Sequence, residues 1–374
     1  MDSREPPLHE LHAERGAKFT DFGGWEMPVE FDSIRTEHEA VRSEAGIFDV
    51  SHMGQIEVSG PDATALMQRL TSNDVGALDP GESQYSCITR EDGVILDDTI
   101  VYRLPDGAAA GASGEETSYL FIPNAGHDGE IYDRWIDHRD ARGLDAAVEN
   151  TTESWAMVAV QGPEAPGMVV DAVTAVEPSA PDEAISKFSR NEGGFATIAG
   201  ARCFVARTGY TGEPGFEVMC PTDDATDVWS AFDCQPCGLG ARDTLRIEKG
   251  FLLSGEDFDP EEEPRTPYEA GVGFTVKLDT EFVGRDALEA QKEEGVDERF
   301  TGFKLLDRGV PRAGYELRDD GERVGHLTSG TMSPTLSEPI ALGYVSAEYE
   351  EGDRLSVVVR GEPKRAKVVT PPFV

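Results

Sequence analysis

The sequence has few basic residues and particularly few lysines. Across 374 residues, 8 lysines and 25 arginines stand against 72 acidic residues, which gives a formal net charge of −39. Because no basic cluster could neutralise phosphates, a nucleic-acid partner is not expected. The acids are spread along the whole chain. This favours a protein from a halophile-like source, because a Debye length of about 3 Å at 1 M salt screens the repulsion between like charges.

Long apolar runs are also missing. No stretch approaches the ~20 apolar residues that a membrane helix needs, and residues 1–7 do not lead into the apolar segment of a signal peptide. We therefore expect a cytoplasmic protein with no membrane partner. The five cysteines are an odd number, which argues against a disulfide framework. Cys234 and Cys237 have CxxC spacing, but no second Cys or His pair stands nearby, so no metal site is predicted.

A doubled acid is the most unusual local feature. Asp97 and Asp98 interrupt residues 94–102, which otherwise read as a buried β-strand. A carboxylate in such a strand costs several kcal/mol unless it meets a hydrogen-bond donor or a cation. Two interpretations stay open: a ligand's N–H groups complete the site, or both acids bind backbone amides at the strand edge. Because side chains alternate along a strand, we expect only one of the two acids to face inward.

The first half of the chain alternates strand-like segments with short helices. Residues 33–45 read as a helix with Ser33 as its N-cap. Residues 58–67 and 160–170 resemble each other, since each runs from a strand end through a Gly-Pro turn into a helix with an acid in its first turn. This similarity predicts two related subdomains, each a sheet with helices packed on it.

The second half has a different pattern. Residues 256–264 are rich in acids but lack the spacing of a Ca²⁺-binding loop, so we expect a solvated loop there. Residues 299–374 alternate polar and apolar in short runs, which predicts an antiparallel barrel or sandwich. The low-complexity residues 107–114 read as a flexible hairpin loop.

Four further segments have an odd composition for core structure. Each combines glycine with aromatic, acidic or basic side chains, and no Gly-Lys-Ser/Thr follows to make a phosphate loop. Taken singly, each is more typical of a turn or of core packing than of a binding site. The segments are residues 22–28, 48–54, 207–217 and 238–246.

Together and in this order, these motifs resemble the aminomethyltransferases of the glycine cleavage system, the T-protein family. The resemblance runs from about Leu8 to Pro372 and includes Asp97-Asp98 and the Thr-Ser-Gly and Ser-Pro-Thr stretches between positions 328 and 335. It implies an α+β fold, a three-subdomain cloverleaf around a central folate site with a C-terminal antiparallel β-barrel. It divides the chain into a catalytic folate-binding region of two interleaved subdomains, residues 1–275, and a barrel domain, residues 276–374.

The resemblance also implies an activity and its residues. A T-protein transfers the methylene of an aminomethyl group, held on the lipoyl arm of the partner H-protein, to tetrahydrofolate and releases ammonia. By motif position, Asp98 resembles the essential acid and Glu217 the acid that hydrogen-bonds the pterin. Arg242 resembles the basic residue near the folate tail. The expected lining of the folate pocket is Met53, Tyr85, Tyr102, Asn124, Phe188 and Tyr210.

Two other functions fit the same resemblance. A folate-dependent demethylase would share the fold but use another one-carbon donor; the oxidase version of that chemistry is disfavoured because no flavin-binding dinucleotide domain is visible. A folate-binding protein for iron–sulfur cluster maturation would carry a Lys-Gly-Cys-aromatic sequence. Here Phe251 stands where that cysteine would be, which favours the transferase.

Overall fold

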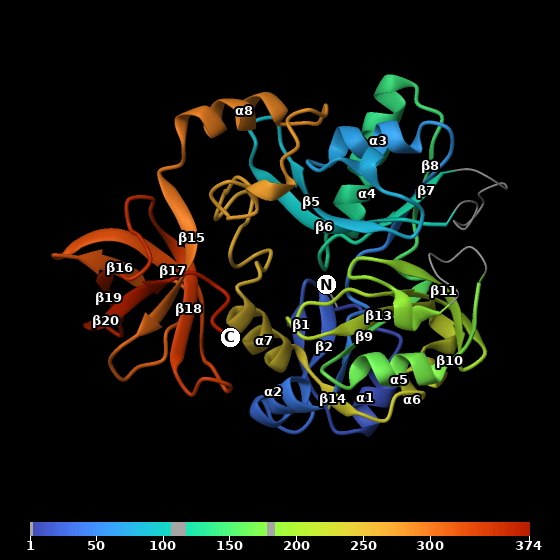
Figure 1. Cartoon of the computed structure of the whole chain (residues 1–374), viewed down its shortest axis with the longest axis horizontal. Helices are drawn as coiled ribbons and strands as arrows, with labels where there is room; N and C mark the ends of the chain where they lie inside the picture. The colour runs from blue at the N-terminus through green and yellow to red at the C-terminus, as the bar shows by residue number, and fades with distance from the viewer. Residues whose placement is uncertain (1–2, 106–116, 178–183) are drawn as a thin grey trace.

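The computed structural model describes residues 3–105, 117–177 and 184–374. In these ranges the chain forms two open sheets, a closed barrel and a two-stranded hairpin. Figure 1 shows the barrel at one end of the molecule and the two open sheets together at the other. The hairpin loop predicted at residues 107–114 lies outside the described residues.

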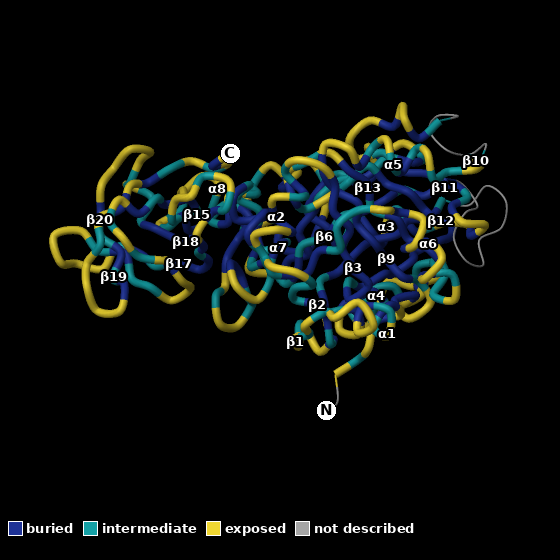
Figure 2. The backbone as a smooth tube through the Cα atoms, turned by 90° about the horizontal axis from the view of Figure 1, so that it is seen from below, coloured by how far each residue is buried: buried dark blue, intermediate teal, exposed yellow. Residues whose placement is uncertain are grey.

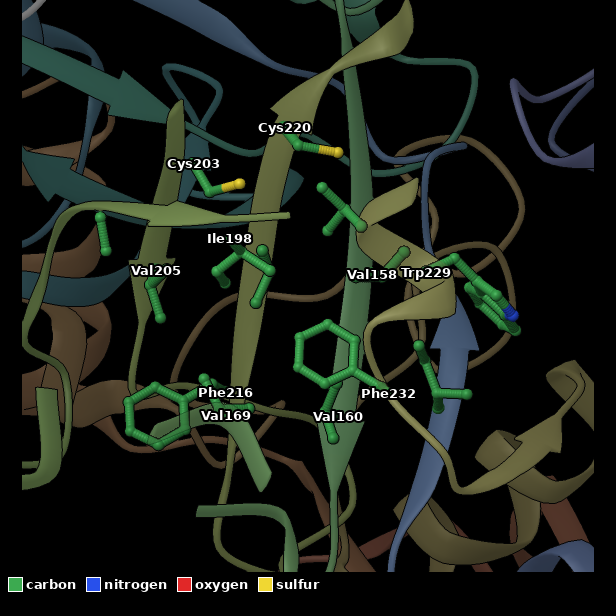
Figure 3. Packing of buried hydrophobic residues seen from close by; sticks show 14 of the residues in the cluster. Val158, Val160, Val169, Ile198, Cys203, Val205, Phe216, Cys220, Trp229 and Phe232 are labelled. Carbon is green, nitrogen blue, oxygen red and sulfur yellow. The ribbon is translucent and has the colours of Figure 1, made fainter. Parts of the chain in front are cut away.

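The larger open sheet has seven strands in the order β10-β11-β12-β13-β9-β3-β14. Neighbouring strands are antiparallel, except that β14 runs parallel to β3. Its apolar core joins Val158 and Val160 of β9 to Val169 of α5 and Trp229 of α6 (Figure 3). The strands are β3 (Gly46–Asp49), β9 (Trp155–Gln161), β10 (Val173–Val176), β11 (Gly193–Ile198), β12 (Ala201–Ala206), β13 (Gly215–Pro221) and β14 (Gln235–Cys237), and the helices are α5 (Ala165–Ala172) and α6 (Ala225–Ser230).

The second open sheet contains the doubled acid. Its strand order is β5-β6-β7-β4-β8, and the strand predicted around Asp97 is β6. Helices α3 and α4 cover it, with the rings of Phe121 and Trp135 stacked 4.5 Å apart in the core between them. The elements are β4 (Ile56–Ser59), β5 (Ser83–Thr89), β6 (Ile95–Arg103), β7 (Ser118–Phe121), β8 (Ala147–Asn150), α3 (Ala63–Leu70) and α4 (Asp128–Arg142).

The internal similarity seen in the sequence corresponds to a repeated strand–turn–helix unit. Strand β4 leads into α3 through Gly60, and β9 leads into α5 through Gly162, with φ angles of +115° and +134°. A Cβ atom at Gly162 would lie 2.5 Å from the Glu44 carbonyl oxygen. Glycine is needed there because the turn combines a left-handed backbone with a close approach. Each unit feeds a different sheet, as the similarity predicted.

The N-terminal segment wraps around the larger sheet. It forms α1 (His9–Glu14), the hairpin β1 (Lys18–Phe22) and β2 (Trp25–Glu30), and α2 (Ile34–Ser43). The predicted N-cap of α2 is confirmed, because Ser33 Oγ accepts a hydrogen bond from the Thr36 backbone N–H at 3.1 Å. The helix is two residues shorter than predicted at its C-terminal end.

The C-terminal region is a barrel rather than a sandwich. Helix α8 (Arg285–Glu294) leads into it, and its strands follow the order β15-β18-β17-β16-β19-β20, closed by the β15–β20 pair. This confirms the predicted α+β architecture with a C-terminal antiparallel barrel. The strands are β15 (Glu298–Leu305), β16 (Glu316–Asp319), β17 (Glu322–Met332), β18 (Pro339–Ser346), β19 (Arg354–Val359) and β20 (Glu362–Val369).

Helix α7 (Leu239–Lys249) joins the two halves of the molecule. It packs on α2 and β2 on one side and on β17 and β18 of the barrel on the other (Figure 1). In Figure 2 the backbone around α7 is largely buried, whereas the exposed segments gather in the barrel loops and on the outer faces of the open sheets.

Charged side chains of α7 hold the barrel in place. The Arg246 side chain, 2% exposed, donates to Asp257, to Asp243 Oδ1 at 2.8 Å and to Ser329 Oγ at 2.6 Å. Asp257 also accepts hydrogen bonds from the Thr328 and Ser329 hydroxyls of β17. The prediction of a solvated loop over residues 256–264 is therefore wrong at Asp257, which is fully buried because it is the counter-ion of Arg246.

A second anchor lies two residues further along the helix. Glu248 accepts hydrogen bonds from Arg42 of α2 and from Ser333 and Thr335 of the barrel. Burial alone would raise its pKa, but hydrogen bonds from His38 and Ser333 lower the pKa of Glu248 to about 2. The stretches at 328–330 and 333–335 thus bind the barrel to α7.

Candidate functional site

The two acids of β6 meet at a single asparagine. Strand β7 pairs with β6 in a register that sets Phe121 opposite Val101, so Asn124 follows β7 at the level of the acids. The Asn124 side-chain N–H₂ donates to Asp97 Oδ1 and to Asp98 Oδ1, both at 2.6 Å. Asn124 therefore fixes the two carboxylates relative to each other.

Asp97 and Asp98 nevertheless have different surroundings. Asp97 is fully buried and accepts from the backbone N–H groups of Asp98 (2.9 Å) and Asn124 (3.0 Å), with His127 Nδ1 3.2 Å away. Asp98 is partly exposed, and its Oδ2 accepts from the Tyr85 hydroxyl at 2.6 Å. The burial pattern of β6 agrees with the expectation that only one acid faces inward, since Asp97 is buried and Asp98 is not, although Asn124 reaches both from beyond the end of β7. The backbone-binding interpretation describes Asp97 well and leaves Asp98 for a ligand.

The environment of Asp98 changes its acidity. Burial, followed by the neighbouring charge of Asp97, raises the pKa of Asp98 to about 6. Such a carboxylate is largely ionised at neutral pH but can exchange a proton within the physiological range. A carboxyl group that has a raised pKa and remains partly exposed is typical of a functional site.

Glu217 of β13 is a further acidic residue of the site, in addition to Asp97 and Asp98. Its Oε2 atom accepts from the Thr208 hydroxyl and, at 3.5 Å, from the hydroxyl of Tyr102, which is fully buried. Within the described part of the chain, Oε1 has no hydrogen-bond partner. Burial raises the pKa of Glu217. One oxygen is thus fixed by the protein and the other is available to a donor on a ligand.

Arg242 supplies a cation to the same region. Its guanidinium lies 4.2 Å from the centre of the Tyr210 ring, and that ring stacks on Phe251 at 5.6 Å with an interplanar angle of 26°. The Tyr210 hydroxyl donates to the Leu252 carbonyl, which fixes the ring. Over the described ranges, no hydrogen bond or ion pair satisfies the five N–H donors of Arg242. Burial lowers the pKa of Arg242, so a bound anion would stabilise it.

His52 and Met53 lie next to this group. The His52 side chain is fully buried, and neither ring nitrogen has a hydrogen-bond partner among the described residues. Burial and the nearby charge of Arg242 lower the pKa of His52 to about 3, so the ring is neutral. Met53 packs against the core cluster that contains Tyr102.

Phe188 is placed differently from the other predicted lining residues. It is 1% exposed and belongs to the apolar core of the seven-stranded sheet. In the described part of the structure, no ring contact connects it to Asp98, Glu217 or Arg242. Its role in the folate pocket stays a prediction.

Several site residues were not singled out from the sequence. They are Thr208, which supports Glu217, and His127, which lies beside Asp97. Phe251 was named only for the cysteine that it replaces, and its stacking on Tyr210 was not predicted. Thr208 lies inside the glycine-rich motif at 207–217, and composition there pointed only to the segment.

No helix in the described residues combines the length and apolar character needed to cross a membrane.

Comparison with known proteins gives consistent matches over the chain. A family model for the GCVT N-terminal domain matches residues 8–280, and one for the glycine cleavage T-protein C-terminal barrel domain matches residues 299–374. A probable aminomethyltransferase of Haloarcula marismortui is 62% identical over 100% of this chain and 99% of the relative. One of Natronomonas pharaonis is 58% identical over the same shares.

A solved structure agrees with these sequence matches. The glycine cleavage system aminomethyltransferase T of Bartonella henselae superposes with a TM-score of 0.85 at 32% identity, covering 99% of this chain and 98% of the other. The archaeal relatives come from halophiles, in line with the acidic composition. The motifs, the fold and these matches lead to one conclusion: the chain belongs to the glycine cleavage T-protein family.

Proposed function

We propose that this chain transfers the methylene of an aminomethyl group, carried on the lipoyl arm of an H-protein, to tetrahydrofolate with release of ammonia. The class of enzyme, an aminomethyltransferase of the glycine cleavage system, is confirmed by the names of the relatives. The observation that carries the site assignment is Arg242, a partly buried cation without a hydrogen-bond partner among the described residues, near a Glu217 oxygen that is likewise unpartnered there.

Tetrahydrofolate has polar groups that complement these side chains. Its pterin carries an amine beside a ring N–H, and the free oxygen of Glu217 can accept from them. Its glutamate tail is anionic, and the unpaired guanidinium of Arg242 can bind it in spite of the protein's net charge of −39. The lining that we propose for the folate pocket remains Met53, Tyr85, Tyr102, Asn124, Phe188 and Tyr210.

Asp98 is our proposed catalytic acid. Tyr85 and Asn124 hold its carboxylate in one orientation by charge-assisted hydrogen bonds at 2.6 Å. The carboxylate, ionised at neutral pH, stabilises the positive charge that develops on the methylene during transfer. Because this charge is largest in the transition state, the interaction lowers the barrier rather than merely tightening substrate binding.

We also propose the domain division and cellular setting predicted from the sequence. Residues 1–275 form the catalytic region and residues 276–374 the barrel domain, and the enzyme acts in the cytoplasm in glycine catabolism. The two family models, which match residues 8–280 and 299–374, support a boundary in this part of the chain.

The two alternative functions receive no support from the comparisons. In iron–sulfur maturation relatives a cysteine would occupy position 251. Here the Phe251 ring stacks on Tyr210, so the side chain at this position serves packing of the Arg242 site rather than thiol chemistry.

A one-carbon transfer assay with purified components tests the proposal. Aminomethylated, lipoylated H-protein and tetrahydrofolate should together give methylene-folate and ammonia in equal amounts. Unlipoylated H-protein, and reactions lacking folate, serve as controls and should give neither product. Formation of methyl-folate from a free methylated amine without H-protein would contradict the proposal and favour a demethylase. Replacing tetrahydrofolate with other defined pterins identifies the acceptor.

A further inference from the structure

An exposed aromatic ring stands beside the catalytic region. Phe274 lies in a short 3₁₀ segment, η4 (Gly273–Thr275), and is 64% exposed, the highest value among the exposed large apolar residues in the described ranges. Three of the others, Leu306, Val310 and Met332, line an open groove of about 560 Å³ on the barrel. Phe274 is separate from that groove.

The ring of Phe274 is one side chain away from Asp98. Its centre lies 6.1 Å from that of Tyr85, with an interplanar angle of 31°. The hydroxyl of Tyr85 donates directly to Asp98. Strand β5, which carries Tyr85, is the edge of its sheet, and η4 packs against it. Phe274 therefore flanks the approach to Asp98 from beyond the sheet edge.

The backbone that presents Phe274 is firmly anchored. The Thr275 hydroxyl donates to the Val272 carbonyl at 2.8 Å and lies 3.6 Å from Cys87 Sγ of β5. A Cβ atom at Gly273 would lie 2.5 Å from the Tyr268 ring, so η4 packs closely against its own support. The exposure of Phe274 is therefore not a property of a loose loop. Single exposed apolar side chains are common on protein surfaces, so it is the position of Phe274 beside Tyr85, rather than its exposure alone, that points to a contact.

Two directions of approach meet at Asp98. The first direction is that of the folate, whose polar groups are matched by Glu217, Tyr102 and Arg242. Tyr102 lies four residues along β6 from Asp98, roughly 13 Å at the rise of a strand. Phe274 is displaced from Asp98 in the other direction, perpendicular to β6, and lies beyond the edge strand β5. A transfer reaction needs a second substrate at the same carbon, and the side of Phe274 offers an apolar contact rather than polar groups.

We propose that Phe274 binds the lipoyl arm of the donor and guides its aminomethyl carbon towards Asp98. This inference rests on the proposed function. The arm is an apolar chain that ends in sulfur, and sulfur makes favourable contacts at about 5 Å from an aromatic ring. Phe274 is then a substrate-contacting residue for the donor, while Glu217 and Arg242 serve the acceptor.

The test compares Phe274→Ala with Phe274→Tyr and with a matched control, Leu306→Ala. Leu306 is also exposed (46%) but lies on the barrel groove, so its loss controls for removing surface apolar area. Each variant is assayed with two donors, aminomethylated H-protein and free aminomethyl-dihydrolipoamide. In Phe274→Ala the KM for both donors should rise about two- to tenfold, the range of a sulfur–aromatic contact. The KM for tetrahydrofolate and the melting temperature should not change, and Phe274→Tyr should restore the donor KM.

Each other pattern overturns the inference in a recognisable way. A raised folate KM in Phe274→Ala would place the ring against the acceptor. An effect on the H-protein donor alone would place it against the protein surface rather than the arm. Kinetics equal to those of Leu306→Ala would remove the residue from binding. Failure of the wild-type protein to use either donor would overturn the proposed function and this inference together, whereas the patterns above leave the proposed function standing.

Discussion

Two arginines one turn apart on α7 have opposite environments. Arg246 is 2% exposed and its donors reach Asp243, Asp257 and Ser329. Arg242 meets the face of Tyr210 and has no hydrogen-bond partner in the described structure. The same residue type on the same helix is therefore fully paired at one position and, at the other, is the cation that we propose for the ligand.

The difference has an energetic basis. A buried charge is costly unless it is paired and hydrogen-bonded, and burial lowers the pKa of Arg242 whereas the Asp257 carboxylate, in spite of burial, raises that of Arg246. Breaking the Arg246 pair should damage the fold, whereas removing Arg242 should damage binding alone. The predictions below test this separation between a structural and a functional set of charges.

The largest effect should come from breaking the structural pair. Asp257→Ala removes the buried counter-ion of Arg246 and leaves only the half-exposed carboxylate of Asp243 beside the guanidinium, and such a loss costs up to about 3–5 kcal/mol of unfolding free energy. Denaturant unfolding measures it. Ser329→Ala is the matched control, because it removes one neutral hydrogen-bond partner and leaves the ion pair, at a cost of about 1 kcal/mol. Equal, small losses in both variants would show that the ion pair does not hold the barrel to α7.

Removing the charge of Asp98, our proposed catalytic acid, should spare the fold. Asp98→Asn should lower turnover by roughly a hundredfold, or about 2.7 kcal/mol of barrier, as for loss of a preorganised electrostatic partner. Its melting temperature should not fall, because ionised Asp98 is disfavoured in the folded state. Asp97→Asn should instead lower the melting temperature, since Asp97 accepts two backbone hydrogen bonds. Near-normal turnover in Asp98→Asn would exclude Asp98 from the reaction.

The raised pKa of Asp98 gives this prediction a pH dependence. Its folded-state value of about 6 lies above the ordinary value of 3.8. Its contribution to stability is therefore present below pH 3.8 and is lost as the pH rises through about 6. Activity has the opposite sign, because the ionised form is required. A plot of kcat/KM against pH should fall below about pH 6 in the wild type, and no such limb should remain in Asp98→Asn.

Loss of the pterin-binding acid should have an intermediate effect. Glu217→Ala should weaken tetrahydrofolate binding by about 1.5–3 kcal/mol, the scale of a hydrogen bond to a charged group. Titration calorimetry on the purified variant measures this. The melting temperature without ligand should change little, because one Glu217 oxygen has no hydrogen-bond partner among the described residues. Unchanged affinity together with a large loss of stability would make Glu217 a structural residue.

The last prediction concerns the net charge of the whole surface, where each single charge should have only a small effect on stability. A net charge of −39 should destabilise the folded chain when screening is weak. The melting temperature should rise as KCl increases from roughly 0.1 M to above 1 M, where the Debye length falls from about 10 Å to about 3 Å. If screening is the cause, different potassium salts should act alike at matched ionic strength. A flat or falling curve would contradict the halophilic explanation of the composition.

The sequence predicted the parts of this molecule that depend on local pattern. The strand around Asp97, the cap at Ser33 and the paired glycine turns follow from backbone preferences, and the composition pointed to glycine-rich site segments. It could not predict that Asn124 bridges both acids, because these residues are 26 or more positions apart. Nor could it predict that Asp257 is buried, because that burial depends on an ion pair with Arg246 and on hydrogen bonds from Thr328 and Ser329 of the barrel. The acid-rich residues 256–264 are typical of a solvated loop, and only the structure shows that Arg246 pairs with one of them.

The most direct test of the central claim uses the two arginines of α7. Thermal unfolding of the wild type, Arg242→Met and Arg246→Met is measured with and without saturating tetrahydrofolate. We expect Arg246→Met to melt well below the wild type under both conditions, since Asp257 is left buried and unpaired. Arg242→Met should melt with the wild type when folate is absent but lose most of the rise that folate gives. A folate-free Arg242→Met as unstable as Arg246→Met, with its folate-induced rise intact, would contradict the assignment of Arg242 to the ligand.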